Sequence, residues 1–431
     1  MEYTFQILLG EGPLLHQARR WIRYQGAAVG ASDEPILYIV PSGFFGKEYG
    51  TIASLPTTPL KSIDGVPLLF GSPGVERVGN CLVIRADIIA STYFMVTRYE
   101  EVVRRDLRDE HGRFPGKQSL PYRAGFIDHP IVDEYAALLR KWLREVGVNV
   151  PEPKRKFSVL LTHDVDHLRK FRRRTQVLRT AASVLLGRQS WQQIPESLRV
   201  VFGLQREPFD TFEDLIALDA GLGQAPSCPR SEAVYFLMAG GNPRFDGTYD
   251  IRSKAARETL RTVLQSGASI GLHTSYEAAG RFERIAEEKA RLEEACGFPI
   301  RRNRCHYLAW REVEDGWALA KAGIRWDSTL GYPDIAGFRL GVCRPIPLFD
   351  PVRMCEMGIE EHPLIIMDGT LSDARYMGLQ EDEALQRCLE LMQTTRRHDG
   401  EFVVLWHNSS LGRSGSYHRR LYERLLAALA S

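Results

Sequence analysis

The sequence predicts an α/β protein in which a smaller α/β domain precedes a larger one with parallel strands. After residue 156, seven β-like segments alternate with helix-like segments, which is typical of parallel strands joined by helical crossovers in an open sheet or a closed barrel. Before them, VNVPEPKRK (Val148–Lys156) has two prolines around an acid and then basic residues, as a domain boundary does. We therefore expect domains at 1–147 and 157–431, with a linker at 148–156.

The first domain contains β-like segments separated by turn residues, and charged segments with helical character. We expect a charged helix in Arg98–Phe114 that ends near Gly112, and a second helix in Glu134–Gly147. This part of the chain has neither a G-x-G-x-x-G pattern nor a phosphate loop, so its role cannot be inferred from sequence. The expected strands are Glu34–Gly43, Gly65–Gly71 and Asn80–Thr97.

The second domain has the alternating pattern throughout. Helices are expected in Arg252–Gly267 and Phe282–Gly297, with Gly297 as the C-cap. The seven expected strands are Phe157–Asp166, Glu232–Gly241, Ala268–Ser275, Arg302–Trp310, Ile324–Tyr332, His362–Leu371 and Glu401–Asn408.

Composition indicates a soluble protein without a strongly charged partner. The 431 residues are 44% apolar and 26% charged, and the net charge of +2 gives no reason to expect nucleic acid binding. No apolar run is long enough to span a bilayer, and the first residues lack the pattern of a signal peptide. The seven cysteines are scattered and odd in number, which favours reduced thiols and hence a cytoplasmic location.

Polar side chains capable of chemistry follow nearly every expected strand of the second domain. The carboxyl ends of parallel strands are where α/β proteins place their active sites. Six such endings on successive strands therefore predict one shared site. The residues are Asp164, Asp166, His273, Arg304, His306, Asp327, Asp368 and His407.

Asp164 and Asp166 end the first of these strands. Residues two apart in a strand face the same side, and two adjacent carboxylates repel unless a cation or proton separates them. A divalent metal would bind one acid and leave the other as a base. Either acid alone is more simply a solvent-exposed turn or a helix N-cap. With His273 and His407 on neighbouring strands, we favour the metal.

The remaining candidates each have a plainer alternative. Arg304 is a surface cation or the group that keeps the free base ionised, and His306 lies two residues further along the same strand. Glu277 either reaches the metal or faces solvent at the start of a helix. His407 is either a histidine bonded to a loop carbonyl or a general acid.

Taken in order, these motifs resemble the polysaccharide deacetylases of carbohydrate esterase family four, the NodB-homology group. The resemblance covers roughly Lys156–Ser431 and rests on THDVD, HTSYE, RCHY and LWHN. It implies Asp164 as catalytic base, Asp166 and His273 as metal ligands, Arg304 as the residue that orients the base, the Tyr307 backbone N–H in the oxyanion hole, and His407 as general acid. By the loosest match, it also implies Asp327 as the acid that tunes His407.

Two departures from the family pattern affect the metal site. Glu277 stands where the family has the second histidine of its second motif, and His306 stands where it has proline. A histidine lost from one loop and gained on the next strand would restore an Asp-His-His set, so we prefer His306 to Glu277 as third ligand. The expected cofactor is a divalent metal, with zinc as the first choice.

The resemblance implies a distorted (β/α) barrel of about seven strands. It also implies metal-dependent removal of an N-acetyl group from an amino sugar in surface polysaccharide biosynthesis. Two other functions remain open: a catalytically inactive barrel that binds glycan or a partner, and a hydrolase of a non-sugar amide.

Three weaker signals lie outside these motifs. The basic segment His167–Gln176 is more simply a solvated helix face, although peripheral membrane contact is an alternative. Gly337–Asp350 is expected to form a loop over the barrel end, with Arg339 and Arg344 as candidate substrate contacts. Asp368 is either a site acid or part of an Asp-Gly turn.

Overall fold

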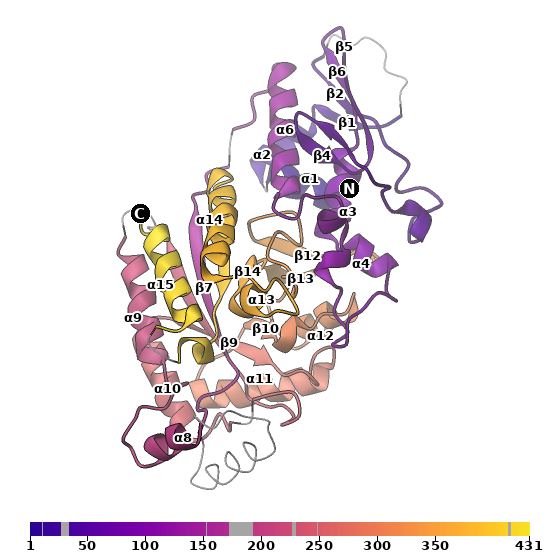
Figure 1. The fold of residues 1–431 in the computed structure, drawn as a ribbon. Helices are drawn as coiled ribbons and strands as arrows, with labels where there is room; N and C mark the ends of the chain where they lie inside the picture. The colour runs from indigo at the N-terminus through magenta and orange to yellow at the C-terminus, as the bar shows by residue number, and fades with distance from the viewer. Residues whose placement is uncertain are drawn as a thin grey trace.

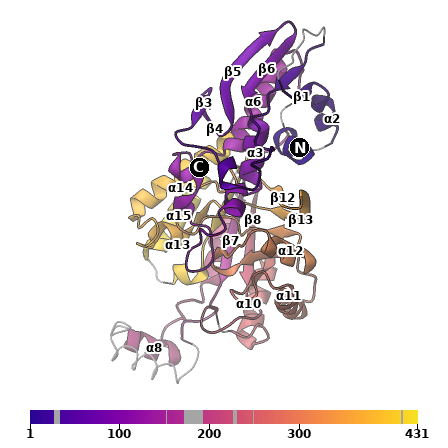
Figure 2. The same cartoon turned by 90° about the vertical axis from the view of Figure 1, so that its right-hand side faces the viewer.

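The computed structural model describes residues 1–10, 12–26, 34–151, 153–171, 193–225, 230–247, 249–412 and 415–431. It contains a four-stranded sheet near the N-terminus, a separate two-stranded hairpin and a nine-stranded sheet (Figure 1). In both Figure 1 and Figure 2, the small sheet lies at one end of the molecule, and the large sheet with its helices fills the rest.

The N-terminal region, residues 1–147, is built around the four-stranded sheet in the order β1-β2-β6-β5. The first three of these strands are parallel, and β5 is antiparallel to β6. The strands are β1 (Ile22–Tyr24), β2 (Leu37–Ile39), β3 (Lys61–Ile63), β4 (Val66–Leu68), β5 (Gly71–Val78) and β6 (Cys81–Ala86). The helices are α1 (Glu2–Leu9), α2 (Pro13–Arg19), η1 (Ile52–Ser54), α3 (Ile88–Val96), α4 (Tyr99–Val103), η2 (Gly116–Gln118), α5 (Leu120–Arg123) and α6 (Ile131–Glu145).

The expected strand Asn80–Thr97 is wrong in its second half. The chain leaves β6 at Ala86, and the Asp87 carboxylate accepts the backbone N–H of Ala90 at 3.0 Å, which caps α3. Every residue of α3 is buried, so this helix has no polar face and its sequence shows no helical period. A continuous apolar run of this kind does not distinguish a buried helix from a buried strand.

The expected charged helix in Arg98–Phe114 is also mostly wrong, because α4 ends at Val103. The following residues form turns. In one of them, Asp109 Oδ1 accepts the backbone N–H groups of His111 and Arg113, both at 2.9 Å. An aspartate that bonds nearby backbone in this way favours a turn over a helix.

The large sheet confirms the predicted α/β fold and contains all seven expected strands. Its order is β12-β13-β11-β10-β9-β8-β7-β15-β14, and it curls into an incomplete barrel with β12 and β14 at its two edges. The strands are β7 (Ser158–Val165), β8 (Ser231–Leu237), β9 (Ser269–Thr274), β10 (Arg302–Cys305), β11 (Trp326–Asp327), β12 (Ile346–Asp350), β13 (Cys355–Glu361), β14 (Ile366–Met367) and β15 (Glu401–Leu405).

Helices connect the parallel strands, as expected. The end of α11 follows the prediction, since Gly297 adopts a left-handed conformation with φ 80°. The helices are α8 (Gln193–Val201), α9 (Phe212–Gly223), α10 (Lys254–Gln265), α11 (Phe282–Cys296), η3 (His306–Leu308), α12 (Glu314–Lys321), α13 (Asp368–Ser372), α14 (Glu381–Arg397), η4 (Asn408–Leu411) and α15 (Tyr417–Leu429).

The segment Gly337–Asp350 differs from the expected loop. Its last residues form β12, which pairs antiparallel with β13 at the edge of the sheet. Arg339 Nε donates to Glu101 at 2.9 Å, and Arg344 Nε donates to Asp133 at 2.7 Å. Both arginines therefore bind the N-terminal region, and the prediction that they contact substrate is wrong.

The contact between the two regions includes a further buried ion pair. Arg98 follows α3, and its Nε lies 2.5 Å from Glu312 Oε1 with both side chains fully buried. Arg98 Nη2 also donates to the carbonyl of Phe349 in β12 at 3.3 Å. A buried charge is costly without its counter-ion, so the two regions present complementary charges at this contact.

Three findings bear on the expected cellular setting. Among the described residues, no helix is both long enough and apolar enough to cross a bilayer. The six cysteines in the described part of the chain are all free. Residues 172–192, which include half of the basic segment considered for membrane contact, lie outside the described residues.

Candidate metal centre and active site

The carboxyl ends of five parallel strands bring the predicted residues together. Asp164 lies near the end of β7, and Asp166 follows that strand. His273 lies in β9, Arg304 lies in β10, and His306 opens the η3 turn directly after β10. Asp368 follows β14, and His407 follows β15. Because these strands are parallel neighbours in one curled sheet, their ends converge on a single site.

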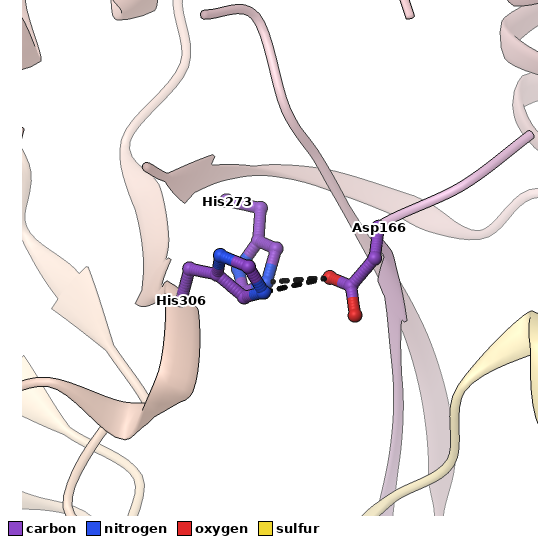
Figure 3. A group of neighbouring side chains, drawn as sticks. All are labelled: Asp166, His273 and His306. Carbon is purple, nitrogen blue, oxygen red and sulfur yellow. Dashed lines mark ion pairs between the residues drawn. The ribbon is translucent and has the colours of Figure 1, made fainter. Parts of the chain in front are cut away.

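Asp166, His273 and His306 form the predicted metal group (Figure 3). Their ligand atoms all lie within 4.8 Å of one another. The carboxylate Oδ1 of Asp166 is 3.1 Å from His273 Nε2 and 3.6 Å from His306 Nε2. Ligands at about 2.0–2.2 Å from a tetrahedral zinc ion lie about 3.3–3.6 Å apart, so these spacings suit such an ion.

Hydrogen bonds on the far side of each imidazole fix the atom that faces the metal group. His273 Nδ1 donates to the carbonyl of Arg304 at 2.9 Å, and His306 Nδ1 donates to the carboxylate of Asp246 at 2.7 Å. Each Nε2 then carries a lone pair. Histidines that bind metals are held in this way by carbonyl or carboxylate partners.

Unsatisfied buried atoms provide the test of whether a cation fits. Asp166 Oδ1 and His273 Nε2 are buried without a hydrogen-bond partner, although they lie 3.1 Å apart. Two buried acceptors facing each other are costly unless a positive charge lies between them. An Asp-His-His donor set with converging lone pairs therefore fits a divalent ion such as zinc.

Glu277, the other candidate for third ligand, faces away from this group. Its Oε1 accepts Asn242 Nδ2 at 2.7 Å, and its Oε2 lies 3.1 Å from Arg284 Nη1. The geometry thus brings His306 into the metal group and leaves Glu277 outside it.

Asp164, the predicted base, lies buried between Arg304 and the metal group. Its Oδ1 is 3.6 Å from Arg304 Nη1, and its Oδ2 is 3.6 Å from His273 Nε2. Arg304 is fully buried and donates to Ser328 Oγ at 2.8 Å. Burial lowers the pKa of Arg304, but arginine starts so far above neutrality that it remains a cation. It therefore places a positive charge beside the Asp164 carboxylate.

His407, the predicted general acid, is paired with Asp368. Its Nδ1 lies 2.7 Å from Asp368 Oδ1, its backbone N–H donates to Oδ2 of the same carboxylate at 3.0 Å, and its Nε2 is 3.7 Å from Asp166 Oδ2. Burial lowers the pKa of His407, but Asp368 and Asp166 outweigh burial and raise it to about 10. Asp368 is therefore a site acid rather than only a turn residue.

Asp327, the residue loosely expected to tune His407, lies elsewhere. It accepts Asn303 Nδ2 at 2.7 Å and the backbone N–H of Thr329 at 3.0 Å, within the core below the site. That expectation is wrong, because the strand that reaches His407 is β14 with Asp368 and not β11 with Asp327.

Tyr307 lies at the rim of the site in an unusual conformation. Its φ is 61° and that of Leu308 is 53°, so two consecutive residues other than glycine occupy the left-handed region. They border a cavity of about 230 Å³ next to the metal group. The cavity is lined by Arg113, Asp164, Asp166, His306, Tyr307, Leu308, Met367, Gly369, Tyr376 and His407.

Sequence reasoning missed two residues that contact the predicted ones. Asp246, the partner of His306, lies in the loop after β8. Strand β8 was the expected strand of the large sheet for which the sequence offered no site residue. Its loop carries Asp246. Arg113, which lines the cavity, comes from the N-terminal region. No local pattern connects Arg113 with residues about 200 positions away.

Comparisons with known proteins give limited similarities. Residues 1–147 match the family described as "Family of unknown function (DUF7033)". No curated protein sequence matches the chain. Among solved structures, a candidate polysaccharide deacetylase from Mycobacterium smegmatis is similar at 16% identity, 65% coverage of this chain, 87% coverage of that chain and a TM-score of 0.41.

Two further solved structures show similarities of the same size. A family 4 carbohydrate esterase from Streptomyces lividans, in complex with acetate, is similar at 10% identity, with 64% of this chain and 88% of that chain covered and a TM-score of 0.31. PuuE allantoinase is similar at 11% identity, with 65% and 88% covered and a TM-score of 0.40. Similarities of this size say nothing about activity, which has to be supported by the site's own residues.

Proposed function

We propose that this chain is a metal-dependent hydrolase that removes the N-acetyl group from an amino sugar. The observation that carries the proposal is the placement of two different acid–base groups around one metal group. Oδ2 of Asp164, which lies beside Arg304, is 3.6 Å from His273 Nε2. Nε2 of His407, which is bonded to Asp368, is 3.7 Å from Asp166 Oδ2. Amide hydrolysis needs this combination, because a base must activate water and an acid must protonate the leaving amine.

Asp166, His273 and His306 would hold the metal. A divalent ion bound there supplies Lewis acidity toward the acetyl carbonyl and the attacking water. Asp164 accepts the proton of that water, and Arg304, 3.6 Å away, orients its carboxylate.

The remaining steps concern the oxyanion and the leaving group. The backbone N–H of Tyr307 stabilises the negative charge that develops on the carbonyl oxygen. His407, held by Asp368, protonates the departing amine, which releases acetate and the free amino sugar. The sugar as substrate rests on the resemblance carried by the four sequence motifs, as does a place in surface polysaccharide biosynthesis.

The test uses the full chain, stripped of metal with a chelator and reloaded with zinc. Acetate release is measured from N-acetylhexosamine oligomers and from simple N-acetyl amides. We expect release from the sugars, and a loss of about 10²–10⁴-fold in Asp164→Asn with an unchanged melting temperature. Asp382→Asn, an exposed carboxylate on α14, is the matched control and should retain full activity.

Two outcomes would contradict the proposal. A protein that binds neither zinc, nickel nor cobalt and releases no acetate would be a binding protein. Release from simple amides, with none from the sugars, would make the chain a hydrolase of non-sugar amides.

A further inference from the structure

Arg113 belongs to the N-terminal region but reaches the cavity beside the metal group. Asp109 shapes the turn that carries it by accepting the backbone N–H groups of His111 and Arg113 on Oδ1. The other oxygen, Oδ2, accepts Nε of Arg113 at 2.7 Å. One carboxylate thus stabilises the turn and orients the guanidinium of Arg113. The side chain of Arg113 is only 5% exposed.

The guanidinium connects two parts of the cavity wall that are far apart in sequence. Nη1 of Arg113 donates to the backbone carbonyl of Tyr307 at 2.9 Å, and Nη2 donates to the hydroxyl of Tyr376 at 3.2 Å. A second residue of the same segment, Lys117, donates Nζ to the carbonyl of Tyr376 at 2.6 Å. The N-terminal region therefore holds both Tyr307 and Tyr376 from outside the large sheet.

The conformation of Tyr307 makes this contact consequential. Tyr307 and Leu308 both have positive φ, which is unfavourable for residues with a Cβ and persists only where surrounding contacts enforce it. The bond from Arg113 is such a contact, and the centre of the His111 ring lies 4.6 Å from that of the Tyr307 ring. A change in the Tyr307 turn would move the peptide N–H assigned above to the oxyanion.

We propose that Arg113 is a positioning residue of the active site: it holds the Tyr307 turn in its left-handed conformation and fixes Tyr376 across the cavity. The chain thus depends for its chemistry on the N-terminal region, for which the sequence indicates no role. The inference rests on the proposed function, because the Tyr307 N–H acts on the oxyanion of that reaction.

Arg113→Ala in the zinc-loaded full chain is the first test. A group that positions an oxyanion donor acts in the transition state, so kcat should fall about 10–100-fold while KM stays within about threefold. The affinity for zinc should be unchanged. Asp109→Asn weakens the contact that orients Arg113 but leaves Arg113 in place, so it should lower kcat by a smaller factor. This variant replaces Arg113→Ala as the test if Arg113→Ala does not fold.

Arg105→Ala is the matched control. Arg105 lies in the same segment and also pairs with the large-sheet region, at 3.3 Å from Glu314, but both side chains are about half exposed. Its kcat should equal that of the wild type. A kcat of Arg113→Ala within twofold of the wild type would overturn the inference, as would a loss explained by weaker zinc binding.

Hydrogen exchange provides a readout that does not require activity. Arg113→Ala should increase exchange of the backbone amides in residues 306–310 at least tenfold more than Arg105→Ala does. Unchanged exchange there would refute the positioning role even if the enzyme is active. A wild type without hydrolase activity whose 306–310 amides still respond to Arg113→Ala would refute the proposed function and leave the role of Arg113 standing.

Discussion

Asp246 is hydrogen-bonded to His306, one of the proposed metal ligands, and replacing it tests how the proposed site is built. Its Oδ1 accepts Nδ1 of His306 at 2.7 Å and the backbone N–H of Tyr276 at 2.8 Å. Its Oδ2 accepts the backbone N–H of Asn242 at 2.9 Å. Asp246→Asn keeps an acceptor toward His306, but it removes the negative charge and turns an amide donor toward the N–H of Asn242.

The magnitude follows from what each substitution removes. Loss of a partner that orients a metal-binding histidine costs about 10–100-fold in metal affinity. Asp246→Asn retains the hydrogen bond and should lie near the lower value, about tenfold or about 1.4 kcal/mol. Asp246→Ala removes both charge and acceptor and should lie near 100-fold, about 2.7 kcal/mol.

Isothermal titration of the chelator-treated protein with zinc measures these values. Asp250→Asn is the matched control, because Asp250 is an exposed acid in the same loop and its carboxylate bonds to Arg252, two residues away. Zinc affinities of Asp246→Asn and Asp246→Ala within twofold of the wild type would refute this account of the site. An equal loss in Asp250→Asn would show that the effect is a general one of charge.

Two further predictions concern stability. Glu312→Gln leaves Arg98 buried without its counter-ion, so the free energy of unfolding in urea should fall by about 3–5 kcal/mol. Burial lowers the pKa of His362, but Glu360 and Glu401, at 3.1 and 2.7 Å, outweigh burial and raise it to about 9. The stability that this pairing gives is fully present below about pH 6.5 and is lost as pH rises through about 9, with an upper value of about 3 kcal/mol.

Each stability prediction has its own comparison. Glu314→Gln removes an exposed partner of Arg105 and should change the free energy of unfolding by at most about 0.5 kcal/mol. An equally small effect of Glu312→Gln would mean that the buried pair is not needed. For His362, the difference between wild type and His362→Gln is measured at pH 6 and pH 10. A difference that stays constant, or grows with pH, contradicts the assigned charge.

The sequence predicted those parts of the site that are governed by local rules. Asp164, His273 and His407 follow apolar segments that can be recognised as strands, and parallel strands bring such ends together. The preference for His306 over Glu277 followed from the two departures from the family motifs, and His306 lies in one group of possible ligands with Asp166 and His273. These inferences needed no knowledge of how the helices pack.

The missed features depend on contacts between distant segments. Asp246 and His306 are 60 residues apart, and Arg113 and Tyr307 are 194 apart. From the sequence, Arg339 was a candidate substrate contact. In the structure its guanidinium is bonded to Glu101 of the N-terminal region. The helix α3 was missed because complete burial removes the polar face that would reveal its period.

The incomplete closure of the large sheet leaves β12 as an edge strand. A closed barrel has no edges, whereas an open sheet presents unpaired backbone groups that can pair with another chain. Here Tyr3 donates its hydroxyl to the carbonyl of Pro347 at 2.8 Å, and Arg98 donates to that of Phe349. Pro347 itself has no N–H to offer a neighbouring strand.

The N-terminal region thus covers the exposed edge of the sheet with side chains instead of with another strand. A fragment that begins at residue 157 would uncover this edge and favour self-association. The first 147 residues therefore contact this edge of the sheet as well as the Tyr307 turn beside the proposed site.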